Sequence, residues 1–437
     1  MFRAGCLTLF FCLMSALVAL RGEEGFRPLF NGHNLDGWVN VNCAPGTWRA
    51  TNGVLYCTGV PIGELRTARM HQNFILDLEW RHLKPKGNAG VFVWADDLPA
   101  RGQPFIRGIE VQVLDGREGE WFTSDGDIFP IHGAKMTPIN GRGGDRAFPT
   151  EKRSKPSPEW NHYRIECNDG AISLAVNGAV VTRGHNASPR KGYICLESEG
   201  SPVEFRNIRL KTLPVKEALP PEQIATTDQG FESLYNGVDL SGWRVTPELA
   251  KHWLPKDWIL EQACGKWDGE KHLWTEKEYG DFILVADWRW VEKPKTNNFP
   301  VILPEGVQLL KPDGTPEIIE VPDAGDSGIF LRGSHDAQVN IWCHPVGSGE
   351  IHGYRKKSAS SPEVRAGATP KSKADQPIGH WNRFVITLRG NRATVVLNGE
   401  TVIESVELPG IPAKGSIGLQ RHTGTIQFAN LFIRELD

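Results

Sequence analysis

Polar residues, three of them glutamates, recur two positions apart in the first half of the chain, a spacing that can bring carboxyl groups together for acid–base chemistry. In "GIEVQVLDG", Glu110 and Gln112 alternate with valines, and in "CLESEG" Glu197 and Glu199 have the same spacing. Successive side chains of a β-strand point to opposite faces, so each pair lies on one face. If both strands belong to one sheet, the carboxyl groups converge and can hold a metal ion or act as acid and base. A sheet with one solvated face would show the same alternation.

A second polar set lies in the other half of the chain, where "AQVNIWCHP" repeats the alternation with different side chains. The positions that correspond to Glu110 and Gln112 carry no carboxylate there. The set contains Arg332, Gln338, Asn340, Trp342, His344, Glu350, His352, Tyr354, Gln420 and His422. Such a set supplies bases, metal ligands and groups that stabilise an oxyanion. The competing interpretation is a hydrogen-bonded corner with surface histidines, in which Arg332 is a structural ion-pair partner.

The two polar sets belong to two copies of one long repeat. "GFRPLFNGHNLDGW" (25–38) returns as "GFESLYNGVDLSGW" (230–243), "NAGVFV" (88–93) returns as "DSGIFL" (326–331), and four further blocks return in the same order. A repeat of this length indicates the tandem duplication of a whole domain. We therefore divide the chain into a leader (1–22), a first domain (23–212), a Pro-rich linker (213–229) and a second domain (230–437).

Short alternating segments predict an all-β fold for both copies. The blocks are rich in β-branched and aromatic residues and are separated by Gly, Asn, Asp and Pro. "LAVNGAVV" and "VVLNGETV" place Asn-Gly between apolar residues, which is a strong signal for a hairpin. No stretch has helical periodicity over three turns. We expect two antiparallel sandwiches or jelly rolls, with an inserted loop at 292–325 over one end of the second.

The N-terminus has the layout of a secretory signal peptide. Arg3 precedes an apolar run from Leu7 to Leu20, which is short for a membrane span, and charged residues follow. We expect an exported protein, periplasmic or extracellular, that has no membrane segment after cleavage; an uncleaved anchor is the alternative. Six cysteines follow the leader. Export permits disulfides among them, but spacing does not define the pairing.

Charge and composition narrow the class of partner. A formal net charge of −3 and a pI near 6.5 give no electrostatic reason to expect nucleic acid. The chain contains 15 tryptophans, whose flat faces pack well on sugar rings but also fill protein cores.

The repeated blocks resemble a known family. The opening "LFNG", the strand "SGIFLRG", the following "EVQ", the "EWN" before a strand and the closing "GLQRH" or "LESEG" occur in that family's order. It is the family of 3-keto-disaccharide hydrolases, or 3-keto-glucoside-1,2-lyases, formerly a domain of unknown function, and the resemblance covers nearly all of the chain after the leader, twice. It implies a concanavalin A-like jelly roll in each copy, a sugar-binding groove and secretion by sugar-degrading bacteria.

The resemblance also implies a reaction. A ketone at C3 of the sugar acidifies the hydrogen on C2, a base removes it, the C1 substituent is eliminated, and water then adds. The site needs a base, an acid and a group that stabilises the enolate oxygen, for which a divalent metal ion is one possibility. We predict catalytic roles for Glu110, His132, Glu197, Glu350, His352 and His422. We predict that Gln112, Asp127, Arg332, Gln338, Asn340, Trp342, Tyr354 and Gln420 bind an oxidised glucoside or disaccharide.

Two other functions fit the same sequence. A tandem lectin-like protein would bind sugar without turnover, and a scaffold or adhesion protein would use two sandwiches for avidity. Sandwiches of this type host lectins and enzymes alike, so the enzymatic prediction depends on the resemblance.

Overall fold

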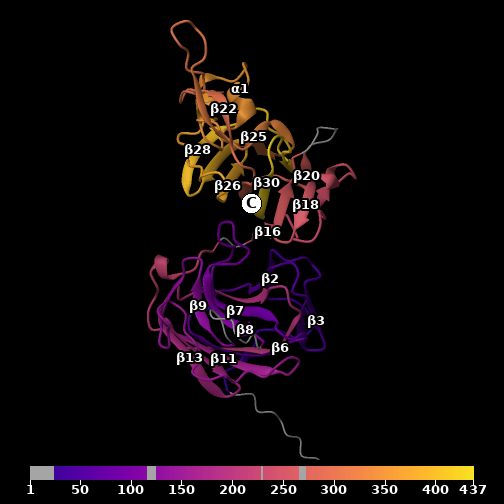
Figure 1. The fold of residues 1–437 in the computed structure, drawn as a ribbon, viewed down its shortest axis with the longest axis vertical. Helices are drawn as coiled ribbons and strands as arrows, with labels where there is room; N and C mark the ends of the chain where they lie inside the picture. Colours follow the sequence, from indigo (N-terminus) through magenta and orange to yellow (C-terminus); the bar gives the residue numbers. More distant parts are fainter. Residues whose placement is uncertain (1–23, 116–124, 228–229, 265–271) are drawn as a thin grey trace, which may run out of the picture.

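The computed structural model describes residues 24–115, 125–227, 230–264 and 272–437. Two β-sandwiches follow each other along the chain, the first drawn in indigo to magenta and the second largely in orange and yellow (Figure 1). The fold is therefore all-β, with a jelly-roll sandwich in each half of the chain, as the alternating segments predict. The predicted leader lies outside the described residues, and no described helix has the length and apolarity needed to cross a membrane.

The first sandwich consists, within the described residues, of a nine-stranded and a six-stranded antiparallel sheet. The larger sheet has the order β10 (Lys135–Pro138), β13 (Ala179–Ser188), β12 (Ala171–Val176), β11 (Asn161–Asn168), β6 (Phe74–His82), β15 (Val203–Thr212), β4 (Val54–Cys57) and β3 (Trp48–Thr51), with β1 (Arg27–Pro28) on β15. The smaller sheet has the order β2 (Trp38–Val41), β5 (Gly63–Thr67), β14 (Tyr193–Ser198), β7 (Asn88–Ala95), β8 (Gly108–Leu114) and β9 (Ile128–Ile131).

The second sandwich repeats this plan with an eight-stranded and a five-stranded sheet in the described part of the chain. The larger sheet has the order β18 (Trp253–Lys256), β19 (Ile259–Gln262), β30 (Ile426–Glu435), β21 (Phe282–Trp290), β26 (Asn382–Arg389), β27 (Arg392–Leu397) and β28 (Glu400–Glu407), with β16 (Glu232–Ser233) on β30. The smaller sheet has the order β17 (Trp243–Arg244), β20 (Leu273–Tyr279), β29 (Gly415–Leu419), β24 (Asp326–Leu331) and β25 (Ser334–Trp342).

The segment predicted as a loop at 292–325 contains a two-stranded hairpin. Its arms β22 (Lys295–Pro300) and β23 (Ile318–Asp323) pair antiparallel, so the expectation of a long loop was wrong for these residues. Their backbone groups find partners in each other, which an isolated loop could not supply. Helical elements are short: η1 (Pro221–Gln223), η2 (Leu249–Lys251), α1 (His352–Lys356) and α2 (Pro362–Gly367).

Both predicted Asn-Gly turns join neighbouring strands. Asn177 and Gly178 have φ of 47° and 92° between β12 and β13, and Asn398 and Gly399 have 54° and 89° between β27 and β28. Positive φ at both central residues is what a tight hairpin turn requires, and Asn and Gly accept it at low cost. Each sandwich then buries one apolar face of each sheet in a core of its own.

The two sandwiches also contact each other directly. Phe92 and Tyr193 of the first pack with Phe231, Val285 and Phe432 of the second in a third apolar cluster. These contacts place the outer face of the eight-stranded sheet of the second sandwich against the outer face of the six-stranded sheet of the first. In Figure 1, β16, β26 and β30 accordingly lie on the side of the second sandwich that faces the first.

Candidate functional site

Glu110 and Glu197 meet on the outer face of the six-stranded sheet, on strands β8 and β14. Between them lies Gly90 on β7, where an added Cβ would be 2.8 Å from Glu110 Oε1 and 3.0 Å from Glu197 Oε2. Because Gly90 has no side chain, the carboxyl groups of Glu110 and Glu197 both extend into the space above it. Glu110 is 6% and Glu197 1% exposed. The expected convergence of these carboxyl groups is present, in a buried setting.

Burial and crowding favour the protonated form of these carboxyl groups. Burial raises the pKa of Glu110 and Glu197 well above the usual range, and neighbouring carboxylates raise the pKa of both further. Burial also raises the pKa of Glu64, on the adjacent strand β5, to about 8. We call Glu64, Glu110, Gln112 and Glu197 the first polar face.

The other predicted residues of the first sandwich differ in their contacts. Gln112 Nε2 donates to Asn88 Oδ1 at 2.7 Å, and the buried Asp127 pairs with Arg146 at 3.1 Å. His132 follows β9 in a left-handed turn with φ of 51°, and its Nε2 has no hydrogen-bond partner among the described residues. Burial lowers the pKa of His132, which favours a neutral ring.

The equivalent face of the second sandwich replaces the carboxyl pair with an amide pair. In the strand registers Phe92 faces Glu110, and its counterpart Phe330 faces Gln338. Gln338 Nε2 donates to Gln420 Oε1 at 2.5 Å, above Gly328, the counterpart of Gly90. The geometry is therefore kept while the two titratable groups are replaced by groups that do not ionise. We call Asp326, Gln338, Asn340 and Gln420, with Glu350, His352 and His422 beside them, the second polar face.

Two histidine–carboxylate pairs border this amide pair. His352 Nδ1 lies 3.1 Å from Glu350 Oε1, and Arg355 Nε lies 2.7 Å from the same oxygen. Glu350 is fully buried, whereas the side chain of His352 is 32% exposed. A buried carboxylate held by an arginine thus orients a histidine that solvent and ligand can reach.

The second pair is more open. His422 Nδ1 lies 3.6 Å from Asp326 Oδ2, and their side chains are 43% and 34% exposed. Burial raises the pKa of Asp326, while the neighbouring His422 and His352 oppose this rise. Because both histidines act on Asp326, the two pairs form one electrostatic cluster.

An aromatic stack flanks the cluster. The rings of Trp342 and His344 are stacked at 3.8 Å with an interplanar angle of 11°, and Phe299 of β22 lies 3.9 Å from His344. Burial lowers the pKa of His344 to about 4, so the stacked ring is neutral near pH 7. His352 contacts Trp342 edge-on, with centroids 5.6 Å apart. The inserted hairpin therefore contributes to the wall beside His352.

Asn340 adds an unpaired acceptor to the same face. Its side chain is 2% exposed, and its Oδ1 has no hydrogen-bond partner in the described part of the chain. A buried polar atom without a partner is costly in a folded protein, so a ligand hydroxyl at this position would relieve that cost.

Arg332 and Tyr354 lie away from the cluster and hold loops in place. Arg332 follows β24, donates to the carbonyl oxygens of Gly280 and Gly390 at 2.7 and 2.6 Å, and pairs with Asp281. Tyr354 is the buried residue of α1 and packs in the core, and its hydroxyl donates to Pro409 O at 3.1 Å. Because their polar groups are used in these contacts, we leave both out of the site; the predicted substrate-binding roles have no support in this placement.

The described residues do not gather three or more His, Cys, Asp or Glu side chains in a geometry that could hold a metal ion. The six cysteines after the leader are all free thiols in the described structure. We therefore derive no step through a metal ion.

Access differs between the two polar faces. Phe92, Tyr193 and Cys195 share the first polar face with Glu110, and these residues pack against Phe231 and Phe432 of the second sandwich. The second sandwich thus covers part of the first polar face. The histidine–carboxylate cluster of the second sandwich, in which His352, His422 and Asp326 are partly exposed, lies on the side of the second sandwich that faces away from the first.

Sequence reasoning missed Asp326, Arg355 and Phe299. Asp326 stands where the first copy has Asn88, so comparing "DSGIFL" with "NAGVFV" would have identified a gained carboxylate. Arg355 follows the predicted His352 by three residues at the start of a helix, which brings both to Glu350. No sequence pattern pointed to Phe299, because its contact with His344 depends on how the hairpin folds over the end of β25.

Comparison with known proteins places these sites in context. The model of the 3-keto-alpha-glucoside-1,2-lyase-like domain matches residues 25–211 and again residues 230–434. A 3-keto-disaccharide hydrolase of Bacteroides thetaiotaomicron is 24% identical over 242 residues, covering 44% of this chain and 79% of its own.

Two solved structures are also similar to part of the chain. A "putative glycosyl hydrolase" from Parabacteroides distasonis is 22% identical, with a TM-score of 0.35, and covers 44% of this chain and 95% of its own. A β-1,3-1,4-glucanase (lichenase) derived from a mouse hindgut metagenome is 15% identical, with a TM-score of 0.28, and covers 40% and 92%. Since the family model matches both halves of the chain, the protein belongs to the family of 3-keto-alpha-glucoside-1,2-lyase-like domains and carries that domain twice.

Proposed function

We propose that this protein is exported and cleaves 3-keto-glucosides or 3-keto-disaccharides at the second polar face. Membership of the family supports the substrate class. The observation that carries the assignment to the second sandwich is the Arg355–Glu350–His352 chain, a reachable histidine oriented by a buried carboxylate. Glu110 and Glu197 are nearly inaccessible by comparison.

His352 is the proposed base for the C2 proton. Its Nδ1 faces Glu350, so its Nε2 remains for the substrate, and Glu350 stabilises the imidazolium that forms. The C2–H electrons form an enolate, in which the C3 oxygen gains negative charge. Amide groups of Gln420 and Asn340 are the nearby neutral groups that can position the sugar hydroxyls and this oxygen.

The His422–Asp326 pair is the proposed proton donor for the departing C1 oxygen. The enolate collapses to a C1=C2 double bond as the C1–O bond breaks, and the aglycone leaves with a proton. Water then adds its hydroxyl to C1 and a proton returns to C2. The sum of these steps is hydrolysis, which accommodates both the lyase and the hydrolase names of the family.

The first test uses a 3-keto glucoside with a chromophoric leaving group. His352→Ala should lower kcat 10²- to 10⁴-fold, the usual contribution of a positioned general base. His132→Ala is the matched control, because His132 belongs to the other sandwich, and should stay within about twofold of wild type. Equal losses in both variants, or loss only in Glu110→Gln, would move the activity to the first polar face.

A second readout addresses the order of steps. In D₂O, wild-type protein should introduce deuterium at C2 of the released 3-keto sugar, because a solvent-derived proton returns there after elimination. A product without deuterium at C2 would rule out the elimination route. Sugar binding without any release would support the lectin-like alternative.

Metal dependence is tested by a chelator. Since the described side chains form no ligand set, turnover should stay unchanged after dialysis against EDTA. A loss of turnover that is restored by a divalent cation would show that a metal ion takes part. Export is tested separately, by the mass and N-terminal sequence of protein recovered outside the cytoplasm, which should lack the leader.

A further inference from the structure

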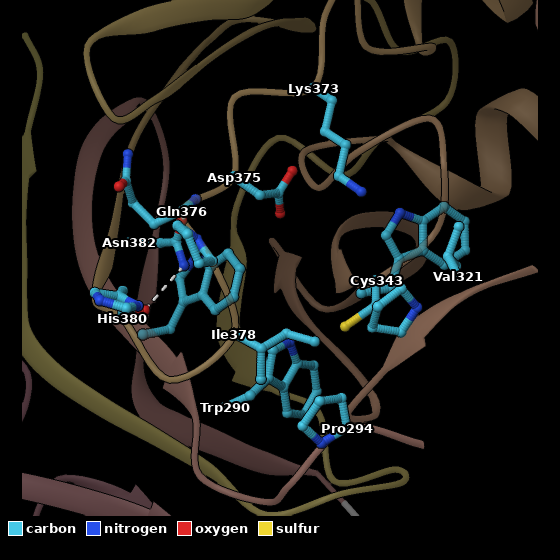
Figure 2. A pocket seen from close by; sticks show the side chains of 14 residues that line it. Trp290, Pro294, Val321, Cys343, Lys373, Asp375, Gln376, Ile378, His380 and Asn382 are labelled. Atoms are coloured by element: carbon cyan, nitrogen blue, oxygen red, sulfur yellow. Dashed lines mark hydrogen bonds between the residues drawn. The ribbon is translucent and has the colours of Figure 1, made fainter. Parts of the chain in front are cut away.

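A cavity of about 500 Å³ opens at one end of the second sandwich, between its two sheets (Figure 2). Its walls come from β21, β23, the end of β25, the start of β26 and the segment 373–380. This volume lies within the range of pockets that hold small molecules. The cavity is distinct from the histidine–carboxylate cluster, none of whose four members lines it.

The lining is aromatic on several sides. Trp288, Trp290 and Trp342 contribute indole rings, and Pro294 and Ile378 add aliphatic surface. Flat apolar walls of this kind favour a planar apolar ligand, because ring faces pack closely against indoles. The polar side chains of the lining come from residues 373–382: Lys373 and Asp375 lie at the top of Figure 2, and Gln376, His380 and Asn382 lie on its left side.

Two buried hydrogen-bond donors at this cavity lack partners. Trp288 is 1% and Trp290 3% exposed, and the Nε1 atom of each has no hydrogen-bond partner among the described residues. Buried indole N–H groups ordinarily find an acceptor, so a ligand with an acceptor oxygen would complete the site. The exposed ammonium group of Lys373 at the rim of the cavity is a further donor for such an acceptor oxygen.

One ring links the cavity to the proposed reaction site. Trp342 lines the cavity and is also contacted edge-on by His352. The cavity and the proposed reaction site therefore share the Trp342 indole as a common wall.

We propose that this cavity binds an aryl group carrying an acceptor oxygen, the aglycone portion of an aryl 3-keto-glucoside. The identity of the aglycone rests on the proposed function, whereas binding of a free aryl ligand does not.

The binding test uses 4-nitrophenol as the probe, titrated into the full-length protein by calorimetry. Wild type should bind one equivalent. Trp290→Phe keeps a ring but removes the N–H donor, so Kd should rise five- to tenfold. Ile378 is half-buried and lines the cavity, so Ile378→Phe should fill part of the cavity and abolish binding of 4-nitrophenol. Trp160→Phe, in the first sandwich, is the control and should leave Kd unchanged. Melting temperatures identify any variant that fails to fold.

The outcomes separate the two proposals. Absence of heat with wild type, or the same Kd in wild type, Trp290→Phe and Ile378→Phe, would overturn the aryl site. If 4-nitrophenol binds as expected and phenyl 3-keto-glucoside is cleaved with a lower KM than the methyl 3-keto-glucoside, both proposals stand. Equal KM values, with Ile378→Phe affecting neither, would overturn the aglycone assignment. Binding of 4-nitrophenol without cleavage of any 3-keto-glucoside would contradict the proposed function and leave the aryl-binding site standing.

Discussion

Glu110 and Glu197 occupy the positions that Gln338 and Gln420 occupy in the second sandwich, and each pair lies over a glycine. Carboxyl and carboxamide groups have nearly the same shape, so the exchange removes two groups that can ionise without requiring a different shape. The buried acids must keep protons or pay for desolvation, whereas the amides form a neutral hydrogen bond at any pH. Each copy thus places a different chemistry on the same strands.

The raised pKa of Glu64 predicts a pH effect on stability. Its folded pKa of about 8 exceeds the unfolded value near 4.5, so the folded state binds the extra proton between these values. Stability should therefore fall as pH rises from about 4.5 to about 8, by on the order of 3–5 kcal/mol for full ionisation. Glu64→Gln should remove this loss and raise the melting temperature at pH 8.5, with little change at pH 4.5.

The control for that measurement is Glu217→Gln, since the Glu217 side chain is 73% exposed. It should follow the wild-type pH profile. A Glu64→Gln variant whose melting temperature falls with pH as steeply as that of wild type would contradict the assignment of the slope to Glu64.

The hairpin of β22 and β23 is the element that most distinguishes the second copy. It adds Phe299 to the stack of His344 and Trp342 and so extends an aromatic wall beside His352. Short elements complete the site as well: α1 begins at His352 and brings Arg355 to Glu350 one turn later.

Loss of the hairpin's ring should weaken substrate binding more than chemistry. Aromatic contacts contribute about 0.5–1.5 kcal/mol, so Phe299→Ala should raise KM roughly three- to tenfold and leave kcat within about twofold. Leu310→Ala is the matched control, because Leu310 lies in the same insertion and is 56% exposed. Steady-state kinetics on the chromogenic 3-keto glucoside decide the matter; an unchanged KM for Phe299→Ala would exclude the stack from the binding site.

At the scale of the whole molecule, the two sandwiches share a buried polar centre as well as an apolar cluster. Asp287 on β21 accepts from Gly102 N at 2.8 Å and Asn430 Nδ2 at 2.7 Å, and it pairs with Arg383 at 2.6 Å. Asn430 also donates to Ala100 O of the first sandwich at 3.2 Å. These directional contacts fix one copy on the other, so the covered part of the first polar face stays covered.

Gly102 is the position at which this contact can be tested. Its φ is +66°, and an added Cβ would lie 2.1 Å from Trp381 Cγ. Gly102→Ala should force the loop away from the second sandwich, split calorimetric unfolding into two transitions and increase the radius of gyration in solution scattering. Gly143→Ala has comparable backbone strain, with φ of +97°, but open space around it. It should keep a single transition, and two transitions in both variants would attribute the effect to backbone strain alone.

Much of the architecture follows from local sequence pattern. Period-two alternation around Val111 and Val113 or Val339 and Ile341 defines strands, because side-chain direction in a strand depends only on position along it. Asn-Gly at 177–178 and 398–399 defines hairpins for an equally local reason, the positive φ of the turn. The duplication is also evident from the repeated sequence blocks, and the same blocks carry the resemblance to the family.

Tertiary structure decided what those patterns meant. Glu110 and Glu197 are 87 positions apart, and only strand order brings them over Gly90. The sequence offered Arg332 and His352 equally as site residues. In the structure Arg332 donates to loop carbonyl oxygens, whereas His352 is oriented by Glu350. The placement of one sandwich on the other then leaves the second polar face more accessible than the first. Contacts between distant segments depend on the packing of the whole chain, which no local alternation encodes.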